Sequence, residues 1–142
     1  MVEIKTRITF VYGEAQVPER YKTWDKLRSI VNASSLPWAA MGDFNEVLHA
    51  HEHDGVGNRS QAQMDAFRDA LDTCGLSDLG YKGNPWTFEK KVAGGSFTRV
   101  RLDRALGTTE WCTLFPNAAV EHLSAATSDH SPILVHLATN SP

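Results

Sequence analysis

The first third of the chain alternates between strand-like and helix-like patterns of hydrophobic and polar residues. Residues 7–12 are mostly β-branched or aromatic and end at Gly13, which predicts a strand. Apolar residues then recur at helical spacing over residues 21–31, which predicts an amphipathic helix. The short apolar run at residues 36–41 stops at Gly42 and predicts a buried strand. This strand–helix–strand order is typical of an α/β fold.

The rest of the chain predicts a second helix followed mainly by strands. Ser60 and Gln63 fit a capping box at the start of a helix that ends at Gly75. Further strands are predicted at residues 76–80, 86–91, 97–101, 118–123 and 133–137, with a hairpin at Gly94-Gly95 and a short helix at 111–115 capped by Thr108 or Thr109. The expected fold class is α/β, with a mixed β-sheet and flanking helices.

Composition and charge limit the classes of protein that fit. The 142 residues suit one domain, residues 1–142, and the net charge of −3 argues against a protein that coats nucleic acid by charge alone. Cys74 and Cys112 form no disulfide framework or zinc motif. No signal peptide or membrane-spanning apolar run is recognisable, so we expect no membrane association and an intracellular protein of the nucleus or cytoplasm.

Asp43 and Asn45 directly follow the predicted buried strand at residues 36–41. Ligands of open α/β sheets bind at the carboxyl ends of strands, where a carboxylate can orient a water and a carboxamide can hold a phosphate oxygen. The alternative is a simple turn, because Gly, Asp and Asn favour turns whatever the function.

Two more polar motifs lie next to predicted strands. In Ser128-Asp129-His130 a carboxylate adjoins an imidazole whose basicity it can raise. In the segment from Arg101 to Arg104, Asp103 and Arg101 are spaced to point to one face, although for this motif taken alone a surface salt bridge is the better interpretation.

Together these motifs resemble the endonuclease/exonuclease/phosphatase (DNase-I-like) superfamily over residues 9–137. Between them the sequence resembles the endonuclease domain of plant-type non-LTR (LINE) retrotransposons. The matching segments are Val11-Tyr12-Gly13, Gly42-Asp43-Phe44-Asn45, Arg101-Leu102-Asp103-Arg104 and Ser128-Asp129-His130, with further likeness at residues 44–48, 63–67, 75–80, 110–112 and 115–118. The resemblance implies a truncated domain, the C-terminal half of a two-sheet α/β sandwich, and Mg²⁺-dependent hydrolysis of phosphodiester bonds.

The resemblance also implies a role for each matching residue. Asp43 would protonate the leaving group or orient the attacking water, and Asn45 would hold the scissile phosphate. His130 would contact that phosphate and help the water attack, with Asp103 orienting the imidazole. Asp129 would bind the Mg²⁺ ion, and Tyr12 would offer its hydroxyl to a phosphate oxygen.

The family's metal-binding glutamate has no matching motif in this sequence, which leaves two functions open. The favoured one is a catalytically impaired, retrotransposon-derived domain that acts by binding a protein partner, with nucleic-acid binding weak. The alternative is a Mg²⁺-dependent endonuclease or phosphodiesterase.

Three further features invite an interpretation. His49, His51 and His53 alternate in one loop and could bind a transition metal, although a solvated loop is the simpler interpretation. Trp86 and Phe88 could stack on a base but fit a core better. The basic residues that surround the predicted hairpin could contact a phosphate backbone: Lys82, Lys90, Lys91, Arg99, Arg101 and Arg104.

A half-sandwich is expected to leave one sheet face apolar and uncovered. We therefore expect a homodimer, packed sheet on sheet, or a protein partner in the same place. The contacting residues are expected at alternate positions of four strands: Ile8–Tyr12, Trp38–Met41, Ala118–Leu123 and Ile133–Leu137.

Overall fold

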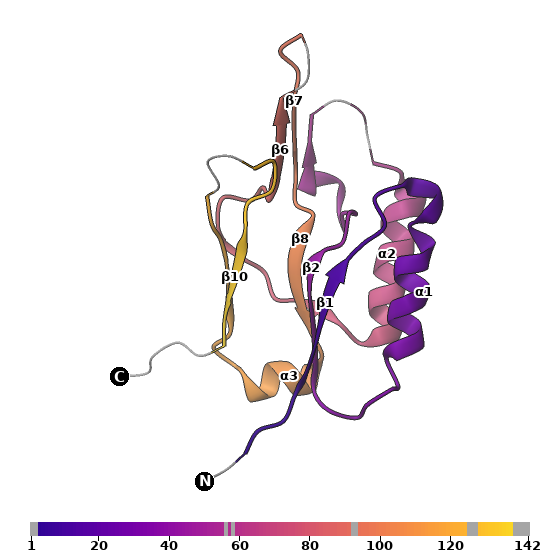
Figure 1. Cartoon of the computed structure of the whole chain (residues 1–142), viewed down its shortest axis with the longest axis vertical. Helices are drawn as coiled ribbons and strands as arrows, with labels where there is room; N and C mark the ends of the chain where they lie inside the picture. Colours follow the sequence, from indigo (N-terminus) through magenta and orange to yellow (C-terminus); the bar gives the residue numbers. More distant parts are fainter. Residues whose placement is uncertain (1–2, 56, 58, 92–93, 125–127, 138–142) are drawn as a thin grey trace.

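The computed structural model describes residues 3–55, 57, 59–91, 94–124 and 128–137, which form three small sheets and three α-helices (Figure 1). The first sheet has the order β1 (Arg7–Tyr12), β2 (Trp38–Asp43), β8 (Asp103–Gly107), β4 (Ser77–Asp78). The second has the order β10 (Ile133–His136), β9 (Ala119–His122), β5 (Lys82–Gly83), and the third β3 (His53–Asp54), β7 (Phe97–Val100), β6 (Phe88–Lys91). The helices are α1 (Tyr21–Ile30), α2 (Gln61–Cys74) and α3 (Thr109–Leu114), with 3₁₀ turns at Val17–Glu19 and Ala50–Glu52. The α/β fold class with a mixed sheet is confirmed, since β1 runs parallel to β2 while β8 is antiparallel to it.

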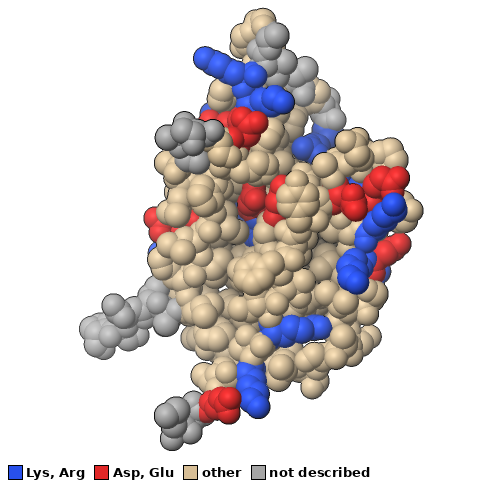
Figure 2. All heavy atoms as spheres, in the orientation of Figure 1, with Lys and Arg blue, Asp and Glu red and all other residues tan. Residues whose placement is uncertain are grey.

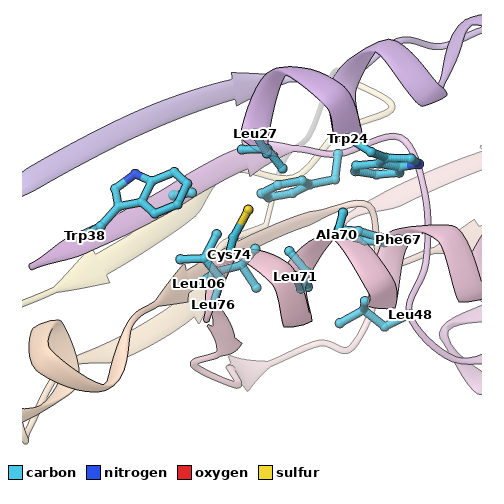
Figure 3. Packing of buried hydrophobic residues seen from close by; sticks show 12 residues of the cluster. Trp24, Leu27, Trp38, Leu48, Phe67, Ala70, Leu71, Cys74, Leu76 and Leu106 are labelled. Atoms are coloured by element: carbon cyan, nitrogen blue, oxygen red, sulfur yellow. The ribbon is translucent and has the colours of Figure 1, made fainter. Parts of the chain in front are cut away.

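The main core lies between the first sheet and helices α1 and α2, which run side by side (Figure 1). Trp24 of α1 stacks on Phe67 of α2 with ring centroids 4.5 Å apart, and Phe44 stacks on the same ring. Figure 3 shows these helices and the sheet contributing side chains to one continuous cluster. Burial of such large side chains is the main stabilising term of the fold.

The opposite face of the first sheet is largely covered by the chain itself. Trp111 of α3 lies against Gly107, where an added Cβ would be 3.0 Å from the indole, and Ala39 and Ala105 are fully buried. Strand β10 contacts β8 on this side. The expectation that the whole face stays uncovered is therefore wrong for β2 and β8, because α3 and the second sheet fill that space.

A strip on β1 is what remains exposed. Ile8, Phe10 and Tyr12 alternate along the strand and are 41%, 80% and 85% exposed. In Figure 1, β1 has β2 on one side only.

Two of the three residues predicted to cap or end a helix do so in the structure. Gly75 ends α2 in the left-handed conformation at φ 67°, and the Thr108 hydroxyl accepts a hydrogen bond from the Trp111 amide at the start of α3. The predicted capping box at Ser60 is wrong, since the Ser60 side chain makes no capping hydrogen bond. Among the described residues, no helix combines the length and apolar character that crossing a bilayer would need.

Candidate active site

Three strand ends bring the predicted acidic and aromatic residues to one edge of the first sheet. Tyr12 and Asp43 are register partners at the ends of the parallel strands β1 and β2. Asp103 pairs with Asp43 because β8 is antiparallel to β2 and begins where β2 ends. The turn before β10 then places His130 beside them. Residues far apart in sequence thus converge because of strand direction and register.

His130 forms the centre of a compact acid–base group. Its Nδ1 lies 3.0 Å from Asp103 Oδ2, and its Nε2 lies 3.7 Å from Asp43 Oδ2. The first distance is a hydrogen bond, whereas the second leaves space for a shared water or phosphate oxygen. The group faces an open pocket of about 520 Å³, lined by Tyr12, Asp43, Asp103, Ser128, His130, Ser131 and Pro132.

Thr87 holds both members of the His130–Asp103 pair in place. Its hydroxyl oxygen accepts the amide hydrogens of Leu102, at 2.9 Å, and Asp103, at 3.0 Å. Its carbonyl accepts the Ser131 amide at 2.7 Å, next to His130. Thr87 is fully buried, and nothing in the strand-like pattern of residues 86–91 distinguished it from a packing residue.

The neighbouring ring of Phe88 supports the imidazole. Phe88 meets the His130 ring edge-on with centroids 5.2 Å apart, and the two residues form an isolated antiparallel bridge. Phe88 also packs against the smaller core cluster around Val100. This agrees with the interpretation of Phe88 as a packing residue. Because its ring contacts that of His130, Phe88 also helps to position the imidazole.

Burial raises the pKa of Asp103 above its ordinary value, and the nearby Asp43 carboxylate adds to the rise. The hydrogen bond from His130 works in the opposite direction but does not cancel the effect of burial. Asp103 and Asp43 are thus two carboxyl groups beside one imidazole, an arrangement typical of acid–base sites.

Asn45 shapes the turn that presents Asp43. Its amide donates to Asp43 Oδ1 at 2.8 Å, and its side-chain amide donates to the Gly13 carbonyl at 2.6 Å. Its φ of 55° is in the left-handed region that Asn tolerates well. Gly13 is required opposite, because an added Cβ would lie 2.5 Å from the Phe44 carbonyl oxygen. Asn45 is not among the residues that line the pocket, and its suggested contact with the scissile phosphate stays a prediction.

Tyr12 and Asp129 differ in how they relate to the pocket. Tyr12 lines it with an exposed side chain. Asp129 is exposed and not among the lining residues, and its carbonyl accepts the Glu89 amide at 2.9 Å. Its suggested role as a Mg²⁺ ligand stays a prediction.

The histidine loop does not form a three-histidine group. The rings of His49 and His51 stack with centroids 5.5 Å apart, while His53 belongs to β3. Within the described residues, the one set of three or more potential ligands that comes together is Asp43, Asp103 and His130. The loop therefore offers no preformed three-histidine site, because a 3₁₀ turn at Ala50–Glu52 contains His51 and separates the extended residues His49 and His53.

Two arginines of the predicted basic cluster are buried in an ionic network instead. Arg101 and Arg104 both pair with Glu52 and Asp78, at 2.8–3.0 Å. Arg104 is fully buried and Arg101 is 6% exposed, so neither can contact a phosphate backbone, and that prediction is wrong for both. Arg101 consequently does not share a face with Asp103.

The remaining members of that region lie at the surface. Arg99 pairs with the Asp54 carboxylate and lies over the Trp86 ring, 5.2 Å from its centroid. Trp86 is half-buried beneath this guanidinium, which favours packing over base stacking. Lys82, Lys90 and Lys91 are exposed.

The donor set of the site fits a magnesium ion. Asp43 and Asp103 offer carboxylate oxygens, the donors that Mg²⁺ prefers, and the ion keeps several waters and takes phosphate oxygens from a substrate. One oxygen of Asp103 is already engaged by His130, which leaves few protein ligands.

Comparisons with known proteins identify the fold. A scan against protein-family models found no match, and a sequence search of curated proteins found none either. Among solved structures, the endonuclease domain of TRAS1, a telomere-specific non-LTR retrotransposon, matches with a TM-score of 0.58 and 17% identity, over 89% of this chain and 53% of that one.

Two structures of a Neisseria nuclease also match. The 3′-5′ exonuclease NExo from Neisseria meningitidis matches with a TM-score of 0.69 and 16% identity, over 93% of this chain and 61% of that chain. NExo, described as a 3′ phosphatase and bound to a product DNA hairpin, matches with a TM-score of 0.66 and 18% identity, over 91% and 60%. The chain thus has a DNase-I-like fold and spans just over half to three fifths of the structures it matches.

Proposed function

We propose that this domain hydrolyses phosphodiester bonds of nucleic acid with a divalent cation, Mg²⁺, as the C-terminal part of a DNase-I-like site. The observation that carries the proposal is the preassembled group of Asp43, Asp103 and His130, within 4.8 Å of one another at the edge of the first sheet. Turn formation alone gives no reason for two partly buried carboxyl groups and an imidazole to meet at one open pocket.

The His130–Asp103 pair supplies a base. Because Nδ1 is hydrogen-bonded to the Asp103 carboxylate, the neutral imidazole carries its proton there and leaves the Nε2 lone pair free. Nε2 then takes a proton from a water that attacks phosphorus, and Asp103 stabilises the imidazolium that forms.

Asp43 orients that water or protonates the leaving oxygen. Its Oδ2 is 3.7 Å from Nε2, a separation that one water can bridge with hydrogen bonds to both groups. Tyr12 stands at the pocket wall, where its hydroxyl can donate to a phosphate oxygen. Asp43 and Asp103 would hold a divalent cation here, and that ion would supply positive charge to neutralise the phosphate oxygens.

Nucleic acid is the proposed substrate class because the matched folds carry that chemistry. One belongs to a retrotransposon endonuclease, and another was solved with a DNA hairpin. A retrotransposon origin is part of the proposal, on the sequence motifs as well as this likeness. We expect slow turnover for the chain alone, because within its described residues Asp43 and Asp103 are the carboxylates that meet at the site.

The test is nicking of supercoiled plasmid with Mg²⁺ and with the chelator EDTA. We expect slow nicking that EDTA abolishes, and a loss of about 10²-fold or more in Asp43→Asn and His130→Ala. Asp72→Asn, a matched change at an exposed position of α2, should nick like the wild type. Activity that survives in both site variants would belong to a contaminant and would refute the proposal.

A second candidate function is binding of a protein partner by a catalytically impaired domain. The exposed strip of Ile8, Phe10 and Tyr12 on β1 favours it, since large apolar side chains at an open strand edge are typical of association sites. Wild-type protein without Mg²⁺-dependent nicking, but with specific association through β1, would favour this function.

A further inference from the structure

Strand β1 presents an open backbone edge as well as exposed side chains. The amides of Arg7 and Gly13 donate to the carbonyls of Pro37 and Asp43, on the side of β2. Because N–H directions alternate along a strand, the amides and carbonyls of Ile8, Phe10 and Tyr12 point away from β2. The described residues include no strand that pairs with this side of β1.

This edge lacks the features that keep edge strands from associating. Residues 8–12 contain no charge, no proline and no glycine, and the strand continues without a bulge in its pairing to β2. Natural edge strands are usually protected by such features. The middle of the face in Figure 2 is correspondingly dominated by uncharged residues, with the charges mostly at its margins.

We propose that a second copy of this chain pairs with β1 through its own β1, antiparallel, about a two-fold axis at Phe10. The first sheets of two copies would then form one continuous sheet. This replaces the sheet-on-sheet dimer expected from the sequence, whose surface on β2 and β8 is already covered within one chain.

The register of the pairing follows from the directions of the backbone groups. Outward-pointing residues must face outward-pointing residues, so Phe10 faces Phe10 of the partner subunit, and Ile8 faces Tyr12 of the partner subunit. These cross-strand pairs of aromatic and β-branched side chains are the ones that stabilise antiparallel sheets. Arg7 meets the partner's Gly13, so like charges do not oppose each other.

On the face of the first sheet that packs against α1, there is room beside β1 for the added strand. A pocket of about 290 Å³ opens between β1 and α1, and the charged residues Glu14, Lys22 and Lys26 line it together with Thr9, Val11 and Ile30. On that side the added strand would present Thr9 and Val11 of the partner subunit, which are small, β-branched side chains that suit such a space.

The contact area is at the lower limit for a specific dimer. Two aromatic side chains of roughly 150–250 Å² each, exposed at 80% and 85%, offer on the order of 300 Å² per copy. Edge-to-edge pairing covers only the flanks of these side chains, which project from the sheet face. With Ile8 and the backbone edge, the total for two copies is therefore at most about 1,000 Å², the size at which specific interfaces begin. We therefore expect a weak dimer, with a Kd in the micromolar range.

Pairing would also act on the candidate active site. Tyr12 lines the pocket of Asp43 and His130, and in the dimer its side chain is flanked by the partner's Ile8. The second copy would hold the otherwise free Tyr12 ring at the pocket wall. The association itself depends only on β1 and stands whether or not the site is catalytic.

Two measurements on the full chain test this interface. Sedimentation equilibrium from 1 to 100 µM should show a monomer–dimer equilibrium in the wild type and in Leu134→Lys, a matched change at an exposed residue on β10. Phe10→Lys should raise the Kd at least about tenfold, because it puts two like charges on the axis. Hydrogen exchange of the wild type should slow with rising concentration at the amides of Ile8, Phe10 and Tyr12, but not at Val11.

The possible results distinguish a homodimer from a monomer and from a complex with a different protein. A wild-type monomer at 100 µM, a dimer that persists unchanged in Phe10→Lys, or exchange protection without this alternation would each overturn the proposal. Protection of these amides only when a different protein is added would assign the edge to that protein instead of a second copy. Nicking activity is not a readout here, so failure of the phosphodiesterase proposal would leave the result intact.

Discussion

At the scale of single residues, Asp103 shows that the site is maintained at a cost to stability. Its pKa is raised, chiefly by burial, so the carboxyl binds its proton more tightly in the folded state than in the unfolded state. The stabilising contribution of this group is fully present below its unfolded pKa and is lost as the pH rises through the folded pKa. Once ionised, Asp103 therefore weakens the fold while its carboxylate orients His130.

The free energy of unfolding of Asp103→Asn, minus that of the wild type at the same pH, should accordingly be larger at pH 7 than at pH 3. Asparagine keeps an acceptor for the His130 Nδ1 proton but never ionises. Urea unfolding of both proteins at the two pH values measures the difference. If this difference is instead larger at pH 3 than at pH 7, burial does not raise the pKa of Asp103.

Thr87→Val should destabilise the domain by about 1–3 kcal/mol, because it leaves the amides of Leu102 and Asp103 without their acceptor. Valine matches threonine in shape, so packing is nearly conserved. Thr87→Ser retains the hydroxyl and serves as the control, with a smaller loss. Equal losses in the two variants, measured by urea unfolding, would mean that the hydroxyl does not hold this segment.

At the scale of elements, the predictions from hydrophobic pattern succeeded where one face of an element is apolar. Strand β1, both long helices and the hairpin of β6 and β7 agree with their patterns. The strand β8 was missed, although it is central to the first sheet. Its sequence, Asp-Arg-Ala-Leu-Gly, contains a buried arginine and a glycine, and only the distant partners Glu52 and Asp78 make that arginine compatible with burial.

This ionic network fixes the start of β8 and couples stability to pH. Burial raises the pKa of Glu52, but hydrogen bonds and charges from Arg104 and Arg101 outweigh it, so the pKa lies below its ordinary value of 4.5. The pKa of Asp78 is lowered in the same way. The stabilisation that the Glu52 and Asp78 carboxylates contribute is present at pH values above their pKa values in the unfolded chain. It is lost as the pH falls through their lower pKa values in the folded protein.

Glu52→Gln should cost about 3–5 kcal/mol near pH 7, because it leaves buried Arg101 and Arg104 short of counter-charge. The cost should shrink as the pH falls through the lowered pKa of Glu52 in the folded protein, where the wild-type carboxyl becomes protonated. Thermal unfolding across pH 3–7 measures it, with the exposed Glu110→Gln as control. A cost that does not depend on pH would show that the charge of Glu52 is not what matters.

At the scale of the whole molecule, the sequence motifs predicted which residues meet, but not how the sheets are covered. Asp43, Asp103 and His130 converge as the resemblance implied. Arg101 instead supports the structure, because a guanidinium group serves buried ion pairs as readily as it serves substrates. The covered face of β2 and β8 was not predictable, since it depends on where α3 and the second sheet fold back.

The central claim is that the His130 imidazole acts as the base of a hydrolytic site, and chemical rescue tests it most directly. The measurement is the Mg²⁺-dependent nicking rate of His130→Ala with and without added imidazole, beside Asp43→Ala as reference. Added imidazole should restore part of the lost activity to His130→Ala, since it can occupy the vacated space next to Asp103, and none to Asp43→Ala. Wild-type nicking that is no faster than that of His130→Ala, or a variant that imidazole leaves unchanged, would contradict the claim.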